Sequence, residues 1–287
     1  MAFKVFVDGS ANLPEKMLDG ITVLPCEYFV DETSHTYLGN VDQFDGHAYY
    51  EDLRNGKVVK TTLLNTQLFL SSFIPVLKEG MDIIYVSMSS GISGTYNAAV
   101  LAARELLEQF EDRYIHVVDS LGCGFGSGML AYYAAELSRR GRTAKQAARL
   151  LERAVPHMCQ YFTVDDLSFL RRSGRLSMVA AKVGTILNTK PILYGDKTGH
   201  IVPCGIVRGR KKAVAALLDK YKTKRTKGSS PLVYISHGDC PEDAEQLAAG
   251  IREVSPDANI TICQHEPFSG AHVGPGMLGL FFHGTER

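Results

Sequence analysis

Residues 82–110 constrain the fold of this 287-residue chain more than any other stretch. Residues 82–86 are a short apolar and β-branched run that predicts a buried strand. Apolar side chains recur at three- and four-residue steps over residues 96–110, which predicts an amphipathic helix. The loop between them is rich in serine and glycine. Such a loop forms an anion site, because free backbone N–H groups and the positive end of the helix dipole face it.

A simpler interpretation of the same loop is that it only begins the helix. Ser93 or Thr95 would then cap the helix through its hydroxyl group. One cap does not need the four serines, two glycines and one threonine found here. Both interpretations stay open on the residues alone.

Composition excludes several classes of protein. Lys plus Arg and Asp plus Glu number 31 each, so no global field attracts nucleic acid or a membrane surface, although a local basic patch is not excluded. No apolar run approaches the roughly 18 residues of a membrane span, and the apolar run at the start is too short for a signal peptide. The six cysteines lie more than 20 residues apart without a Cys-x-x-Cys. We therefore expect no metal site, reduced thiols and a cytoplasmic protein.

The order of the predicted elements indicates an α/β fold in two domains. Predicted strands near residues 3–8, 82–88 and 114–118 alternate with helices, which favours a parallel sheet. In the second half, residues 192–194 and 200–207 predict an antiparallel pair, and residues 232–264 predict a strand, a helix and a strand. We expect a parallel-sheet α/β domain at 1–156 and a mixed α/β domain at 157–287, with Pro156 near the boundary.

Four further predictions concern single segments. Residues 21–30 read as one strand, whereas residues 31–60 are polar and turn-rich and predict no element. Residues 178–188 predict an apolar helix that could line a cavity. Residues 269–276, rich in glycine, predict an irregular loop before a final apolar strand, and His272 lies in that loop.

Glycines 122, 124, 126 and 128 suggest a dinucleotide loop, but the spacing is wrong. They never form G-x-G-x-x-G, and no acidic residue follows about 20 positions later at the end of a strand. The even spacing instead predicts a helix packed closely against a neighbouring strand.

Three other places carry polar or charged side chains that suit a ligand or partner. Asp8 ends the first strand, where ligands gather in open α/β sheets, although it could simply order its own loop. Thr61 and Thr62 form a second hydroxyl cluster, before a helix that Asn65 or Thr66 could cap. Arg208 and Arg210 begin a basic segment at the start of a helix, where positive charge opposes the dipole and needs another reason.

Ordered motifs along the chain resemble those of the DegV family, the fatty-acid-binding proteins of bacterial fatty acid kinase systems. The segments that carry the resemblance are Val7-Asp8-Gly9-Ser10-Ala11-Asn12-Leu13-Pro14, Lys60-Thr61-Thr62, Ser89-Ser90-Gly91-Ile92-Ser93-Gly94-Thr95-Tyr96, Asp119-Ser120, Leu170-Arg171-Arg172-Ser173-Gly174-Arg175-Leu176-Ser177, Lys190-Pro191-Ile192-Leu193, Val207-Arg208-Gly209-Arg210-Lys211-Lys212-Ala213 and His272-Val273-Gly274-Pro275-Gly276.

The resemblance implies a two-domain α/β lipid-binding protein that is not itself an enzyme and needs no cofactor. One long-chain fatty acid would lie in a tunnel formed mostly by residues 157–287. Its carboxylate would meet Thr62 and Ser93, with Thr61 and His272 close by. A separate ATP-dependent kinase would phosphorylate that carboxylate for phospholipid metabolism. Arg208 and Arg210 would lie near the tunnel mouth, facing the kinase or, transiently, a membrane.

The chain departs from the family pattern at three places, and two other functions stay open. Gly9 replaces serine, Leu63-Leu64 replaces Gln-Pro, and Ala271 replaces threonine, which puts the shape of the head-group loops in doubt. The first alternative is a serine-dependent hydrolase or transferase of small acyl substrates, using Ser93 or Ser90 with Asp8 and His272. The second is an anion or lipid sensor without a kinase partner.

Overall fold

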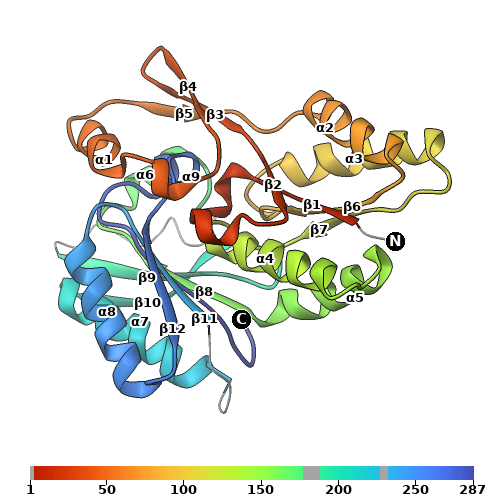
Figure 1. The fold of residues 1–287 in the computed structure, drawn as a ribbon. Coiled ribbons are helices and arrows are strands. Elements are labelled where there is room, and N and C mark those ends of the chain that lie inside the picture. Colours follow the sequence, from red (N-terminus) through yellow and green to blue (C-terminus); the bar gives the residue numbers. More distant parts are fainter. Residues whose placement is uncertain (1–2, 177–187, 227–231) are drawn as a thin grey trace.

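The computed structural model describes residues 3–176, 188–226 and 232–287. These residues form a four-stranded parallel sheet, a six-stranded mixed sheet and a small three-stranded antiparallel sheet, with helices packed against them (Figure 1). The predicted α/β fold with a parallel and a mixed sheet is therefore confirmed.

The parallel sheet belongs to the first half of the chain. Its spatial order is β2 (Ile21–Leu24), β1 (Phe3–Asp8), β6 (Asp82–Ser87) and β7 (Ile115–Asp119). One face is covered by α2 (Thr66–Lys78) and α3 (Thr95–Gln109), and the other by α4 (Phe125–Arg139) and α5 (Ala144–Ala154). Burial on both faces explains why β1 and β6 read as continuous apolar runs.

The three-stranded sheet corrects two predictions. Residues 21–30 are not one strand, because Pro25 lacks an N–H and separates β2 from β3 (Cys26–Val30), which lies in another sheet. Residues 31–60, for which no element was predicted, form β4 (Thr33–Tyr37), α1 (Gly46–Arg54) and β5 (Val59–Thr61). The order β4-β3-β5 is antiparallel throughout.

The six-stranded sheet belongs to the second half. Its order is β10 (Ile201–Arg208), β9 (Thr189–Gly195), β8 (Met158–Thr163), β13 (Leu278–His283), β11 (Leu232–His237) and β12 (Asn259–Gln264). β11 and β12 are parallel, and the predicted β9–β10 pair is antiparallel as expected. Helices α7 (Arg210–Lys224) and α8 (Pro241–Val254) pack on one face. Since every strand of this sheet follows residue 157, we propose the domain boundary near Pro156.

Helix α4 joins the two sheets, and its glycines make that approach close. A Cβ on Gly126 would lie 2.5 Å from Oε1 of Gln160 on β8, and one on Gly128 would overlap the backbone of Ala11. The predicted close packing of this glycine-rich helix against a strand is thus confirmed.

Helix α9 (Pro267–Val273) occupies residues 269–273 of the predicted irregular loop, so that part of the prediction is wrong. Residues 274–277 are irregular and lead into the apolar strand β13, as expected. Pro267 has the fixed φ of a first helical residue, Glu266 accepts from the N–H groups of Phe268 and Ser269, and Gly274 ends the helix at φ 75°. The short α6 (Ser168–Arg172) lies between β8 and β9 in the order of the chain. The helix predicted at 178–188 lies almost wholly outside the described residues.

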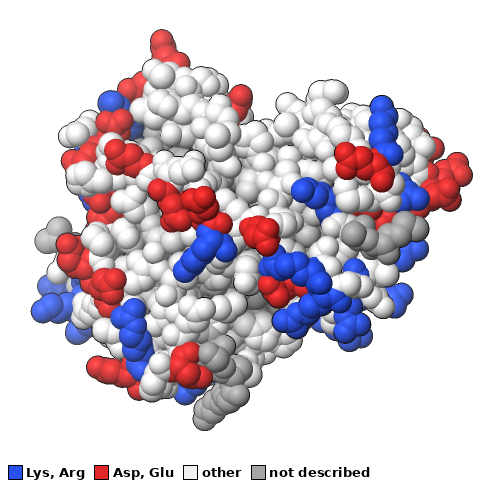
Figure 2. Space-filling view, in the orientation of Figure 1, with Lys and Arg blue, Asp and Glu red and all other residues white. Residues whose placement is uncertain are grey.

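Charge is unevenly distributed although the chain is neutral. Exposed basic side chains gather over α5 and the end of α4, namely Arg139, Arg140, Arg142, Lys145, Arg149 and Arg153 (Figure 2). Residues 26–61, in contrast, hold seven acidic and three basic residues. Over the described ranges, none of the helices is both long and apolar enough to cross a membrane.

Candidate functional site

A cavity of about 340 Å³ lies where the two halves of the chain meet. Thr61 and Ser93 line it from the first half, and Arg175, His265, Ser269 and His272 line it from the second. Apolar side chains form most of the remaining wall: Leu63, Met88, Ile92, Leu121, Phe162, Leu170, Ile201, Phe268, Val273, Met277 and Phe281.

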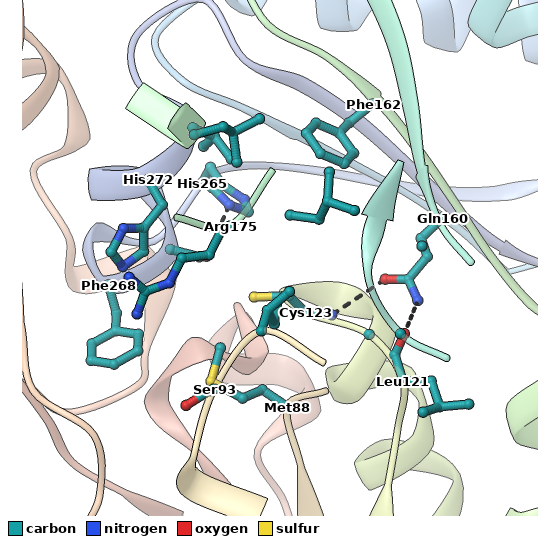
Figure 3. A pocket seen from close by; sticks show the side chains of 18 of the residues that line it. Met88, Ser93, Leu121, Cys123, Gln160, Phe162, Arg175, His265, Phe268 and His272 are labelled. Carbon is teal, nitrogen blue, oxygen red and sulfur yellow. Dashed lines mark hydrogen bonds between the residues drawn. The ribbon is translucent and has the colours of Figure 1, made fainter. Parts of the chain in front are cut away.

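The polar side chains are not spread evenly around this cavity. Figure 3 shows Arg175 and His272 side by side, while Phe162, Leu121 and Gln160 lie on the opposite side. Gln160 is occupied there, because its Nε2 donates to the carbonyl of Leu121 at 3.1 Å and its Oε1 accepts from the N–H of Cys123 at 3.3 Å. The cavity therefore has one cationic end and a largely apolar remainder.

Thr61 and His272 meet across the two halves. Thr61 ends β5, His272 lies on α9, and Oγ1 of Thr61 is 3.0 Å from Nε2 of His272. Burial and the positive charges of Arg175 and Arg172 lower the pKa of His272 to about 4. The imidazole is therefore neutral near pH 7, with one nitrogen able to donate and the other to accept.

Ser93 lines the cavity and also orders its own loop. Its Oγ accepts from the N–H of Thr95 at 3.2 Å and lies 3.0 Å from Oγ1 of Thr95. The N-cap position of α3 is Gly94, which has no side-chain cap. Neither Ser93 nor Thr95 therefore occupies the N-cap position, although Ser93 accepts from the first N–H of the helix. Because a carboxylate only accepts hydrogen bonds, Ser93 would contact one by turning its hydroxyl proton from Thr95 toward the ligand.

Three of the residues singled out from the sequence do not line this cavity: Thr62, expected at the carboxylate, and Arg208 and Arg210, expected near the tunnel mouth. Thr62 follows the last residue of β5 and is exposed, and its hydroxyl donates to the carbonyl of Glu27 at 3.3 Å. Arg208 is exposed at the end of β10 opposite Ile201, which lines the cavity, so roughly 23 Å of strand separates them.

Arg210, the third, is engaged inside the second half. Its Nε is 2.8 Å from the carboxylate of Asp243, a guanidinium nitrogen is 3.4 Å from Asp165, and it donates to the carbonyl of Gly276 at 2.7 Å. These partners offset the unfavourable dipole at the start of α7.

Arg175 is the main cavity residue that sequence reasoning missed. It lies within the motif at residues 170–177, and Gly174 before it adopts a φ of 69°. The signal available in the sequence was an arginine that directly follows a glycine and precedes an apolar stretch. We call Thr61, Ser93, Arg175 and His272 the head-group cluster.

Side chains of the first half form hydrogen bonds to the backbone just before and at the start of α9. Oδ1 of Asn12 accepts from the N–H of Glu266 at 2.6 Å, and Nδ2 of Asn12 donates to the carbonyl of Gln264 at 3.1 Å. The hydroxyl of Tyr49 donates to the carbonyl of Pro267 at 2.7 Å, and that of Tyr50 to His265 at 2.9 Å. We call Asn12, Tyr49, Tyr50 and Glu266 the α9 support.

Two titratable groups of this region are strongly affected by burial. Burial raises the pKa of Glu266 to about 8, against the hydrogen bonds from Ser269 and Phe268 that lower it. Burial lowers the pKa of His265 to about 3. The two nitrogens of His265 lie 3.1 Å from Oγ of Ser236 and 3.0 Å from Oγ of Ser269, so this wall of the cavity is polar but already hydrogen-bonded.

The geometry of a serine hydrolase is not assembled by these residues. His272 is hydrogen-bonded to Thr61, and Asp8 accepts from the hydroxyls of Tyr85 and Ser10. No hydrogen bond within the described ranges joins Ser93 to His272 or His272 to Asp8. Those ranges also hold no cluster of three or more His, Cys, Asp or Glu side chains placed to bind a metal ion.

The departures from the family pattern have separate surroundings. Leu63 lines the cavity and is 54% exposed, whereas Leu64 is buried in the core beneath α2. Ala271 is buried on α9. A Cβ on Gly9 would lie 3.2 Å from both Cys26 and Tyr37, which leaves little space for a serine side chain there.

Comparisons with known proteins agree with this architecture. A family model described as "Uncharacterised protein, DegV family" matches residues 2–285. A DegV domain-containing protein of Clostridium perfringens is 35% identical over 99% of this chain and 98% of its own length. A DegV lipid binding protein of Thermotoga maritima is 26% identical, with a TM-score of 0.85 over all of both chains. DegV of Bacillus subtilis, described as a fatty acid binding protein, is 27% identical, with a TM-score of 0.84 over 99% of this chain and all of its own.

Proposed function

The chain belongs to the DegV family, and we propose that it binds one long-chain fatty acid in the cavity between its two halves. The carboxylate contacts the head-group cluster, and the acyl chain lies against the apolar walls. The observation that carries the proposal is the pairing of a cationic, hydroxyl-bearing end with an apolar remainder in one cavity.

The two parts of the cavity contribute differently to affinity. Burying about 14 methylenes at ~0.8 kcal/mol each gives on the order of 10 kcal/mol of gross transfer free energy. A hydrogen bond to a charged carboxylate contributes about 1.5–3 kcal/mol. The acyl chain therefore supplies most of the affinity, and the head-group cluster fixes the orientation of the ligand.

Lipid binding by relatives supports this proposal. The described relatives from Thermotoga maritima and Bacillus subtilis bind lipid or fatty acid, and they share this fold over nearly their whole length. Thr62 is not among the direct contacts that we propose, because it is exposed and hydrogen-bonded to Glu27.

We further propose that the chain is not an enzyme but presents the carboxylate to a separate ATP-dependent kinase in the cytoplasm. The head-group end supports this, because Leu63 both lines the cavity and is 54% exposed, so this end lies near solvent. Arg208, exposed at the end of β10, remains a candidate contact for the kinase or a membrane. Arg210 is a weaker candidate, because its ion pairs would have to break.

The test of ligand binding is organic extraction of the purified chain, followed by mass spectrometry and by return of fatty acid to the delipidated protein. The proposal expects one long-chain fatty acid for each chain and saturable rebinding. Absence of extracted fatty acid together with no rebinding would overturn it.

The kinase step has its own test. With the kinase and ATP supplied, Ser93→Ala should lower the acyl-phosphate yield while the unfolding midpoint changes little, since Ser93 is only half-buried. An unchanged yield argues against a role for Ser93 in presentation. Ester hydrolysis that Ser93→Ala abolishes would favour the hydrolase alternative.

A further inference from the structure

A second concave site lies on the small antiparallel sheet. A groove of about 390 Å³ runs between the β3–β4 hairpin and α1. None of the residues that line it also lines the acyl cavity. We call it the hairpin groove.

Five aromatic rings form a continuous wall of the hairpin groove. Tyr28 stacks on His35 at 5.1 Å and meets Tyr49 edge-on at 5.9 Å. Phe44 continues the chain of rings, at 5.4 Å from Tyr49 and 5.9 Å from Tyr37. Tyr28 and His35 are cross-strand neighbours and therefore share one face of the hairpin, and Tyr37, two residues after His35, lies on the same face.

The charge of the hairpin groove is negative. Asp45 and Asp52 line it, and its lining holds no Lys or Arg. Asp52 forms an exposed ion pair with Lys57 at 2.9 Å, and one oxygen of Asp45 accepts from the N–H of Ala48 at 3.1 Å. Residues 26–61, which contain the groove, hold seven acidic and three basic residues.

A buried polar atom at the groove is also unsatisfied. Tyr37 lines the groove and is 7% exposed, and its hydroxyl has no hydrogen-bond partner among the described residues. A buried hydroxyl without a partner is uncommon in folded proteins. This oxygen is itself shielded from solvent and lies behind the groove wall, so the surfaces that a ligand in the groove meets are the aromatic rings and the two carboxylates.

We propose that the hairpin groove binds an organic cation of the alkylammonium class. Aromatic faces attract weakly hydrated cations, and the carboxylates add charge that a neutral ligand does not need. An anion would be repelled by both. A small metal ion would need a set of close oxygen ligands, and no such cluster occurs in the described part of the chain.

The test is calorimetric titration of the full chain with choline chloride at constant ionic strength. Its matched ligand is 3,3-dimethylbutanol, which has nearly the same shape without the charge. We expect saturable choline binding, with a dissociation constant on the order of 1 mM, and much weaker binding of the alcohol. Equal binding of the two, or no choline binding, would overturn the proposal.

Two variants of groove residues test whether choline binds in the hairpin groove. Phe44→Leu keeps an apolar side chain, and Asp45→Asn keeps the helix cap while removing the charge. Each should weaken choline binding by about three- to tenfold at an unchanged unfolding midpoint. Asp112→Asn, on a distant turn, is the matched control and should leave the affinity unchanged. Equal affinities for all three variants would overturn the assignment to this groove.

Vesicle binding distinguishes a lipid headgroup from a free small molecule as the source of the alkylammonium group. Binding to phosphatidylcholine vesicles, lost in Phe44→Leu, would identify the cation as a lipid headgroup. Choline binding without vesicle binding would identify a free small molecule. If binding required phosphatidylglycerol instead, and was unaffected by Phe44→Leu, the proposal would fail, because that lipid carries no cation.

Discussion

The polar groups on the two sides of α9 differ in how fully they are hydrogen-bonded. In the α9 support, Asn12 uses both ends of its amide and Tyr49 and Tyr50 both donate to backbone carbonyls. In the head-group cluster, the described residues leave several donors of Arg175 and one nitrogen of His272 without a partner. The first region is complete without a ligand, and the second has hydrogen-bonding capacity to spare.

This difference indicates separate roles for the two regions. A satisfied buried network holds an element rigidly, whereas an unsatisfied one costs free energy until a ligand arrives. Changes in the α9 support should therefore lower stability first, and changes in the head-group cluster should lower affinity first. Both regions include residues that belong to or contact α9. Each variant therefore tests whether the change in stability and the change in fatty acid affinity occur separately.

Asn12→Ala should have the largest effect. It leaves the N–H of Glu266 and the carbonyl of Gln264 without partners and places alanine at a φ of 56°. The free energy of unfolding, measured with urea, should fall by about 2–5 kcal/mol. Asn12→Gly is the matched control: it loses the same two hydrogen bonds but adopts the positive φ without strain, so it should lose less. A loss below about 1 kcal/mol for Asn12→Ala would contradict the role of the α9 support.

Glu266→Gln should change how stability depends on pH. The folded chain holds the proton of Glu266 up to about pH 8, whereas the ordinary pKa is 4.5. This contribution is therefore fully present below pH 4.5 and is lost as the pH rises through 8. The variant cannot titrate, so its stability relative to the parent should rise between pH 5 and 9, on the order of 4 kcal/mol. A constant difference in urea unfolding across that range would show that Glu266 is ionised throughout.

Arg175→Gln should separate affinity from stability. Losing a charged hydrogen-bond donor should weaken fatty acid binding about 10- to 100-fold, while the free energy of unfolding changes by less than about 1 kcal/mol. The pKa of His272, followed by NMR, should also rise from about 4, since Arg175 helps to lower it. An affinity within about twofold of the parent would remove Arg175 from the head-group cluster.

Thr61→Val and Thr62→Val form a matched pair with the smallest expected effects. The first removes a hydroxyl that lines the cavity and bonds His272, and should weaken binding about fivefold. The second removes an exposed hydroxyl directed at Glu27 and should leave fatty acid affinity unchanged. Equal losses in calorimetric titrations would contradict the placement of the two side chains.

Much of the fold was predictable because periodicity is a local property. The strand at residues 82–86, its serine-rich loop and the following helix are visible in the sequence, and β6 and α3 fall there. The three-stranded sheet was missed because its strands are short and half-exposed, so no clear alternation appears. Helix α9 was missed because glycine and proline dominate its surroundings, while the cap that begins it is a single glutamate.

The candidate site was predictable only where motifs could be compared. Thr61, Ser93 and His272 line one cavity, as the resemblance suggested, although their roles toward a ligand stay predictions. The direction of the Thr62 side chain could not be read from the motif, since its contact with Glu27 depends on how β3 and β5 pair. Arg175 joins the cavity through tertiary contacts alone, as do the residues of the α9 support.

The proposed function requires that one end of the cavity binds a carboxylate and that the rest accommodates an apolar chain. The most direct test compares palmitate with methyl palmitate on the delipidated chain, because the two share a tail and differ in the head group. We predict that the ester binds at least about tenfold more weakly, and that Arg175→Gln removes most of that difference. Equal affinity for acid and ester in the parent chain would contradict the account.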